Sequence, residues 1–208
     1  MNLDSFFRSF RQSGKDATYL KQYEEVGLTA VSNLPELCEL FEKLSGTSFE
    51  NGLFKIHTVG SFYLWTEIAF EYFKKYKGNS YCFAFDWVGR QYAVNYSGGK
   101  TSILLLDPAT AEVFKLETDI QSFLNEETDD FKNSHLEIER FNTLSENVAS
   151  NLRFGQCLGF KKFLFLGGKD ELNNFEVNDM EVYWELSYQV YCKTRGLPPG
   201  TIVNLSIE

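Results

Sequence analysis

The sequence predicts an α+β protein in which helices flank a central antiparallel sheet of about four to six strands. The first observation is a series of four short runs rich in aromatic and β-branched residues between residues 80 and 116, separated by short turns. The second is that segments with a helical period of apolar residues lie on both sides of this series. The third is the composition, because 43% of the 208 residues are hydrophobic and 16% are aromatic, enough to fill a large core.

Four helices are expected before the sheet. Residues 3–12 and 17–26 have the spacing of short amphipathic helices. The segment "SNLPELCELFEKLSG" predicts a third helix, which Ser32 or Asn33 caps and Gly46 ends. "SFYLWTEIAFEYFKKYKG" predicts a fourth helix, whose lysines lie at the C-terminal end, where the helix dipole favours positive charge. The apolar stripe of the third helix consists of Leu37, Leu40, Phe41 and Leu44.

The strands are predicted from alternation and from turn residues. "NGLFKIHTV" indicates a turn that leads into a short strand before the fourth helix. The four runs of the meander are "YCFAFDW", "RQYAVNY", "TSILLLD" and "AEVFKL". Gly98 and Gly99 favour a hairpin turn between the second and third runs, and Pro108 a turn after the third.

The C-terminal part is expected to add helices and strands to this sheet. Thr118 or Asp119 caps a short helix, and the polar segment 125–135 marks a boundary between a first part, 1–125, and a second part, 126–208, of one continuous fold. "LEIERFNTLSENVASNL" predicts a helix, and "CLGFKKFLFLGG" a loop and a buried strand. Asn178 is expected to cap the clearest helix of the chain, and "TIVNLSIE" to form a terminal strand. The apolar stripe of that helix consists of Met180, Tyr183, Trp184, Ser187, Val190 and Tyr191.

The charge of the chain favours a basic partner. The formal net charge is −9, so direct binding of nucleic acid is disfavoured because phosphates require a basic surface. Residues 112–146 contain ten acids and three bases, and residues 170–186 contain six acids and no base. One interpretation is that these carboxylates are solvated side chains of helices and loops. The other is that they form a surface that attracts a cationic protein.

An acidic surface is therefore the candidate partner-binding site. Most carboxylates of the two acidic blocks are predicted to take part, together with one tyrosine that lies near them on the last helix. The predicted contact residues are Glu126, Glu127, Asp129, Asp130, Asp170, Glu171, Asp179, Glu181, Glu185 and Tyr188.

No catalytic, cofactor-binding or metal site is predicted. Gly167-Gly168-Lys169 lacks the spacing of a phosphate-binding loop, and the glycines are expected to turn the chain after a buried strand. The two histidines, His57 and His135, are too far apart for a helical metal motif and are expected to be exposed or partly buried. An enzyme remains an alternative if folding brings a histidine together with a cysteine or a carboxylate in a deep polar pocket.

The chain is expected to be cytoplasmic. Four cysteines without a CxxC pair suit a reducing compartment, as small buried hydrophobic residues. The N-terminus has no apolar segment of a secretory signal, and no apolar run is long enough to span a membrane.

Several spaced motifs of the C-terminal third occur in a recognisable order. They include Gly155-Gln156, Leu158-Gly159-Phe160, Leu166-Gly167-Gly168, Asn173–Val177, Val182-Tyr183-Trp184 and Leu197-Pro198-Pro199-Gly200-Thr201. With them the chain resembles the bacterial family of type VI secretion immunity proteins, in the C-terminal domain found in immunity proteins of DNase effectors. "FAFDWVGRQYAVN" and "LLLDPATAEVFKL" resemble the sheet of the same family, and "LPELCELFEKLSGTSFENGLFKI" resembles its N-terminal GAD-like segment.

This resemblance implies a non-enzymatic antitoxin that binds a cognate secreted toxin, with a nuclease effector as one candidate. The matching motifs look structural, so the resemblance assigns no contact residues. The alternative function is a Smi/Knr-like regulatory interaction module without a toxin partner.

Overall fold

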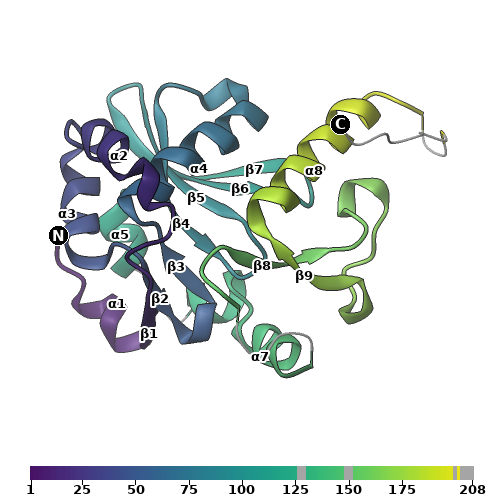
Figure 1. The fold of residues 1–208 in the computed structure, drawn as a ribbon, viewed down its shortest axis with the longest axis horizontal. Helices are drawn as coiled ribbons and strands as arrows, with labels where there is room; N and C mark the ends of the chain where they lie inside the picture. Colours follow the sequence, from purple (N-terminus) through teal and green to yellow (C-terminus); the bar gives the residue numbers. More distant parts are fainter. Residues whose placement is uncertain (126–129, 148–151, 199–200, 202–208) are drawn as a thin grey trace.

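A seven-stranded antiparallel sheet forms the centre of the computed structural model, which describes residues 1–125, 130–147, 152–198 and 201 (Figure 1). Each strand pairs with the strands before and after it in the sequence, so β1 and β7 are the two edges. A separate hairpin-like pair is formed by β8 and β9. The strands are β1 Gln12–Lys15, β2 Thr47–Phe49, β3 Phe54–Ile56, β4 Ser80–Asp86, β5 Gln91–Ser97, β6 Lys100–Asp107, β7 Glu112–Leu116, β8 Gln156–Phe160 and β9 Phe175–Asp179.

Helices cover both faces of this sheet. One face packs against α4 and α8, and the other against α1, α3, α5 and α7 together with a π-helical turn at Phe131–His135. The helices are α1 Asp4–Ser9, α2 Glu24–Val31, α3 Pro35–Leu44, α4 Val59–Tyr72, α5 Ile120–Asn125, α7 Ile138–Asn147 and α8 Met180–Thr194. The predicted α+β class and the antiparallel sheet flanked by N-terminal and C-terminal helices are therefore confirmed.

The sheet has more strands than expected because β1 and β2 extend it beyond β3. β1 is four residues long and fully exposed, so it carries no alternation of apolar and polar residues that would reveal a strand. Its partner β2 lies more than thirty residues further along the chain, with Gln12 opposite Phe49. The four strands of the meander, β4–β7, form as predicted, and the Gly98–Gly99 turn has φ of 66° and 74°, the left-handed values that glycine favours.

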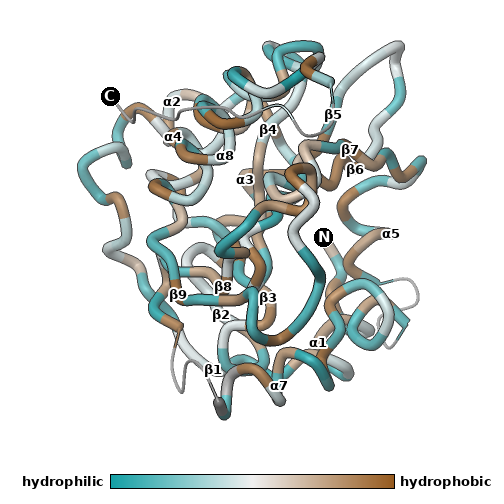
Figure 2. Tube along the Cα trace, turned by 90° about the vertical axis from the view of Figure 1, so that its right-hand side faces the viewer, coloured by the Kyte–Doolittle hydropathy of each residue, from teal (hydrophilic) through white to brown (hydrophobic). Residues whose placement is uncertain are grey.

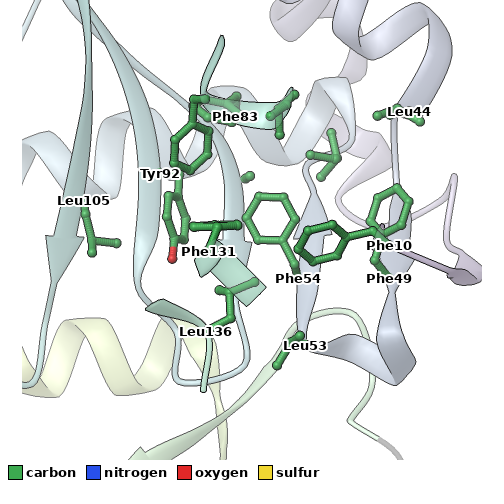
Figure 3. Close-up of a cluster of buried hydrophobic side chains, with 14 of the residues drawn as sticks. Phe10, Leu44, Phe49, Leu53, Phe54, Phe83, Tyr92, Leu105, Phe131 and Leu136 are labelled. Carbon is green, nitrogen blue, oxygen red and sulfur yellow. The ribbon is translucent and has the colours of Figure 1, made fainter. Parts of the chain in front are cut away.

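Alternate residues of the strands build two hydrophobic clusters, one on each face. On β6, Ile103 and Leu105 belong to one cluster, whereas Leu104 and Leu106 belong to the other. Figure 3 shows the first cluster, in which Phe10, directly after α1, lies among phenylalanines of β2, β3 and the π-helical turn. Both clusters also contain residues of β8, so the C-terminal part is packed onto the sheet on both faces.

The N-terminal helices differ from expectation in three places. α1 ends at Ser9, so the helix expected for residues 3–12 is shorter, and Gln12 already belongs to β1. α3 has the predicted bounds and its apolar stripe is buried, but its N-terminal residue is preceded by Leu34, and neither Ser32 nor Asn33 provides a cap. The helix predicted for 17–26 is wrong: a 3-10 turn occupies Lys21–Tyr23, and α2 follows at Glu24–Val31. Leu20 has a φ of 55°, which interrupts any helix that would pass through it.

The C-terminal segment contains one strand that the pattern did not indicate. Gly167 and Gly168 follow a 3-10 turn at Leu164–Leu166, not a strand, and β9 comes after them. A Cβ on Gly168 would lie 2.0 Å from the carbonyl oxygen of Lys162, so the close approach of two backbone segments requires glycine there. β9 is mostly hydrophilic (Figure 2), which hides it from a search for apolar runs.

Asp179, not the predicted Asn178, caps α8. Its carboxylate accepts hydrogen bonds from the backbone amides of Glu181 and Val182, at 3.0 and 3.2 Å. The apolar stripe of α8 is confirmed from Met180 to Val190, and Tyr191 is half-buried.

The polar segment 125–135 is only partly described. Its second half forms the π-helical turn, in which Phe131 is buried whereas Asn133, Ser134 and His135 are exposed. The Trp87 indole donates a hydrogen bond of 2.7 Å to the carbonyl oxygen of Leu136, which fixes the turn to β4. The division into residues 1–125 and 126–208 stays a prediction. The predicted terminal strand, 201–208, lies outside the described residues except for Thr201.

Candidate partner-binding surface

The outer surface of α8 meets α4 in a groove. The cavity has a volume of about 300 Å³. Its lining consists of Glu67, Ile68, Glu71, Tyr72 and Lys77 from the α4 side and Trp184, Glu185 and Tyr188 from α8. Two of the predicted contact residues, Glu185 and Tyr188, are thus brought together with two carboxylates of α4 that the sequence did not single out.

The floor of the groove is aromatic. The Tyr72 ring lies 5.2 Å from the Tyr188 ring and 6.0 Å from the Trp184 ring, measured between centroids. The polar atoms of the deeper rings are engaged inside the protein: the Trp184 indole donates to the Gly89 carbonyl at 2.7 Å, and the Tyr72 hydroxyl contacts Ser187 at 3.1 Å. The groove is therefore lined at its base largely by the carbon atoms of aromatic rings.

Carboxylates surround this floor. Glu71 forms an ion pair of 2.7 Å with Lys74, whose hydrogen bond and charge lower the pKa of the Glu71 carboxyl. Lys77 lies 3.4 Å from Glu71 and 3.7 Å from Glu67, so one lysine is shared between two carboxylates. Glu185 is exposed and accepts a hydrogen bond of 2.8 Å from the Gln189 amide. Because Lys74 and Lys77 already pair with Glu71 and Glu67, Glu185 is the carboxylate of this rim that suits a lysine or arginine side chain of a partner.

Two other predicted residues lie at the N-terminal end of α8. Asp179 is engaged as the helix cap. Glu181 is half-buried, and its pKa is raised first by burial and then by the charge of Asp179. Both carboxylates are thus tied to the structure of the helix start, whereas Glu185 one turn later is free to meet a partner.

The remaining predicted residues are dispersed. Asp170 forms an ion pair with Arg140 of α7, and Glu171 lies 3.5 Å from Lys169. Asp130 is exposed and accepts a hydrogen bond from the Ser134 hydroxyl at 3.2 Å. Glu126, Glu127 and Asp129 lie outside the described residues, and the predicted contact surface as a whole remains a prediction.

Sequence reasoning missed Glu67 and Glu71 because they belong to a segment of balanced charge. They stand four residues apart in "EIAFE", which places both on one side of α4. That spacing is the signal that could have paired them with the α8 residues, once the packing of α4 against α8 was known.

The two histidines differ sharply from each other. His57 is 0% exposed, which corrects the expectation of an exposed or partly buried residue. Its ring nitrogens contact the Ser61 hydroxyl at 3.0 Å and the Gln91 side-chain oxygen at 2.8 Å, so it is a satisfied core residue. His135 is exposed, as expected, and lies beside a surface hollow with Asp130.

Cysteine and metal chemistry receive no support from the described residues. Cys82 and Cys157 are buried as expected and burial raises the pKa of both thiols, whereas Cys192 is exposed, contrary to expectation. Within residues 1–125, 130–147 and 152–198, no group of three or more His, Cys, Asp or Glu side chains is placed to hold a metal ion. In the same part of the chain, no helix is both long and apolar enough to cross a membrane.

A family model matches part of this chain. Residues 102–191, from β6 to the last turns of α8, match the model of the family described as T6SS immunity protein Tdi1, C-terminal. The resemblance to type VI secretion immunity proteins is thereby confirmed for this part of the chain, and the match supports an immunity role. The GAD-like character of the N-terminal segment stays a prediction.

A solved structure shares the whole fold. The crystal structure of Atu4351 from Agrobacterium tumefaciens superposes with a TM-score of 0.62, covering 90% of this chain and 89% of that chain at 15% sequence identity. None of the curated proteins matches this chain.

Proposed function

We propose that this protein is a cytoplasmic immunity protein that neutralises a cognate secreted toxin by binding it, without catalysis of its own. The observation that carries the proposal is the family match over residues 102–191, which includes β6, β7, β8, β9 and most of α8. The α8 half of the groove, with Trp184, Glu185 and Tyr188, lies inside that range.

Charge supports a basic toxin as the partner. The chain carries a net charge of −9, and opposite charge on a partner accelerates association and fixes its orientation. Nucleases are a fitting class of toxin because they must themselves be cationic to hold phosphates. An acidic protein that covers such a site takes the place of the nucleic-acid backbone.

The α4–α8 groove is the part of the surface best suited to anchor that partner. It combines an aromatic floor with exposed carboxylates, and interface hot spots are enriched in aromatic side chains in desolvated pockets. A lysine or arginine side chain of the toxin would stack on Tyr188 and pair with Glu185.

The test is binding and inhibition with the purified product of the toxin gene adjacent to this one. We expect a stoichiometric complex that suppresses the toxin's activity and weakens as salt is raised, since the attraction is between exposed charges. Glu185→Lys should weaken binding about tenfold or more by introducing like-charge repulsion. Glu139→Lys is the matched control, because this exposed carboxylate lies on α7, remote from the groove (Figure 1).

Two outcomes decide between functions. Toxin activity unchanged by an excess of this protein would refute neutralisation and favour the regulatory interaction module. Equal loss of affinity in the Glu185 and Glu139 variants would leave neutralisation in place but remove the groove as the anchor.

A further inference from the structure

β7 leaves one edge of the central sheet open. It is the last strand of the sheet, and among the described residues no strand pairs with its outer side. Native proteins usually protect such edges with charged side chains, above all lysine, or with proline, a bulge or a covering loop, because an unpaired edge can accept an extended chain. β7 contains no proline, its pairing with β6 runs without a bulge, and Phe114 on it is 49% exposed.

The register shows which backbone groups face outward. Ser97 and Lys100 close the two-residue Gly98–Gly99 turn, so this pair exchanges both backbone hydrogen bonds. The direction of the backbone N–H and C=O groups alternates along a strand. These groups therefore point to β5 at the even-numbered residues of β6 and to β7 at its odd-numbered residues. Since Leu105 is paired with Phe114, the backbone of Glu112, Phe114 and Leu116 bonds to β6. The N–H and C=O groups of Val113 and Lys115 therefore point to the open edge.

A hollow of about 390 Å³ lies beside the end of this strand. One wall is the chain from Lys115 to Thr118, and the other is formed by α5 and the π-helical turn. Phe123 and Phe131 are buried and make its apolar floor, while Glu117, Asp130 and His135 lie at its rim. An edge strand with a pocket for an alternate side chain is the arrangement in which extended peptides are bound by strand addition.

We propose that an extended segment of the partner toxin adds to β7 as an eighth strand and places a basic side chain in this hollow. The inference rests on the proposed function and adds a second contact surface to the α4–α8 groove. Backbone hydrogen bonds to Val113 and Lys115 would supply affinity, and Glu117 and Asp130 would select the cationic side chain.

Charge decides which occupant fits. Glu112 on β7 and Glu117 and Asp130 at the hollow are three exposed carboxylates beside one lysine, Lys115, so a basic segment is attracted to this edge. A second copy of this chain would bring the same carboxylates against themselves, and like charges across strands are destabilising. The one lysine on the strand, Lys115, forms an ion pair of 2.7 Å with Glu117 of its own chain.

The first test is a backbone substitution with a matched control. Lys115→Pro removes an outward N–H and leaves the ladder to β6 intact, and proline is tolerated on edge strands. Lys115→Thr removes the same charge but keeps the N–H. With the purified product of the adjacent toxin gene, we expect Lys115→Pro to weaken binding tenfold or more and Lys115→Thr to change it less than threefold, with equal melting temperatures.

The second test needs no variant. Amide hydrogen exchange of the full-length protein should slow at Val113 and Lys115 when the toxin is added, whereas the Phe114 amide, already bonded to β6, is protected in both states. Unchanged exchange at Val113 and Lys115 in a complex that does form would overturn the strand-addition proposal and leave the immunity function standing. Absence of any complex would refute both. A dimer of this protein alone that Lys115→Pro abolishes would assign the edge to a second copy and also overturn the proposal.

Discussion

Two neighbouring positions bury a polar side chain completely, Lys55 within β3 and His57 directly after it, and the two side chains are satisfied in different ways. Lys55 and His57 are both 0% exposed, and both lie against the ring of Phe85. His57 has a partner for each ring nitrogen. The Lys55 ammonium contacts only two backbone carbonyl oxygens, those of Arg153 and Gln156, at 3.3 and 3.2 Å, and forms no ion pair with a described carboxylate.

The protein therefore keeps one buried side chain, His57, neutral and the other, Lys55, charged. Burial lowers the pKa of His57 to about 3, so the ring is neutral at physiological pH. Its two hydrogen bonds therefore stabilise the fold without the cost of burying a charge. Burial lowers the pKa of Lys55 to about 8, so its ammonium is still charged at pH 7 and pays the cost of desolvation. The first site should stabilise the fold, and the second should weaken it.

The largest change in the free energy of unfolding is expected when the His57 side chain is removed. His57→Ala leaves a cavity among Trp65 and Phe85 and strips the Gln91 oxygen of its buried donor. We expect the free energy of unfolding to fall by about 4 kcal/mol, measured by urea denaturation. A loss below about 1 kcal/mol would mean that the site relaxes and is not a satisfied core element.

A smaller loss of stability is expected in the wild type when the pH is lowered. The unfolded chain protonates His57 near pH 6.5 and the folded chain only near pH 3, so acid favours unfolding. The contribution of His57 is complete above pH 6.5 and is lost as pH falls through that value towards 3. Between pH 8 and pH 5 we expect a loss of about 2 kcal/mol. The pH-dependent loss should be smaller by this amount in His57→Ala, and equal pH slopes in the two proteins would contradict the assignment.

The smallest effect is expected at the charged site, with the opposite sign. Lys55→Met keeps most of the length of the side chain and removes the buried ammonium, and we expect stability at pH 7 to rise by about 1 kcal/mol. In the wild type, stability should also rise as pH increases from 8 to 10.5, because the folded state then releases the proton that the unfolded state keeps. Destabilisation by Lys55→Met would show that the two carbonyl contacts outweigh the cost of desolvation.

The same strand explains what the sequence could and could not predict. In "FKIH" apolar and polar residues alternate, which indicates a strand with one solvated face. The strand is there, but its polar side faces α4 and the segment before β8, which the sequence does not place near it. The meander β4–β7 and the stripe of α8 were predictable because their signals are local.

Only the α8 half of the candidate site could be predicted, because the other half depends on a tertiary contact that local patterns do not reveal. Glu185 and Tyr188 stand on a helix that the pattern identifies, whereas Glu67 and Glu71 reach them only through the contact between α4 and α8. β1 and β2 were missed because a pair of short strands so far apart in the chain gains its stability from the sheet it joins.

The coverage of the sheet has a consequence for synthesis of the protein. One face of the sheet is hydrophobic and is covered only when α4 and α8 both pack against it. Its side chains are those of Cys82, Phe85, Ala93, Leu104 and Leu106. Because α8 begins more than seventy residues after β6 ends, a growing chain carries that surface uncovered until this later segment has been synthesised. Nascent chains stalled before α8 should therefore be bound by chaperones or aggregate, while the released protein closes the surface itself.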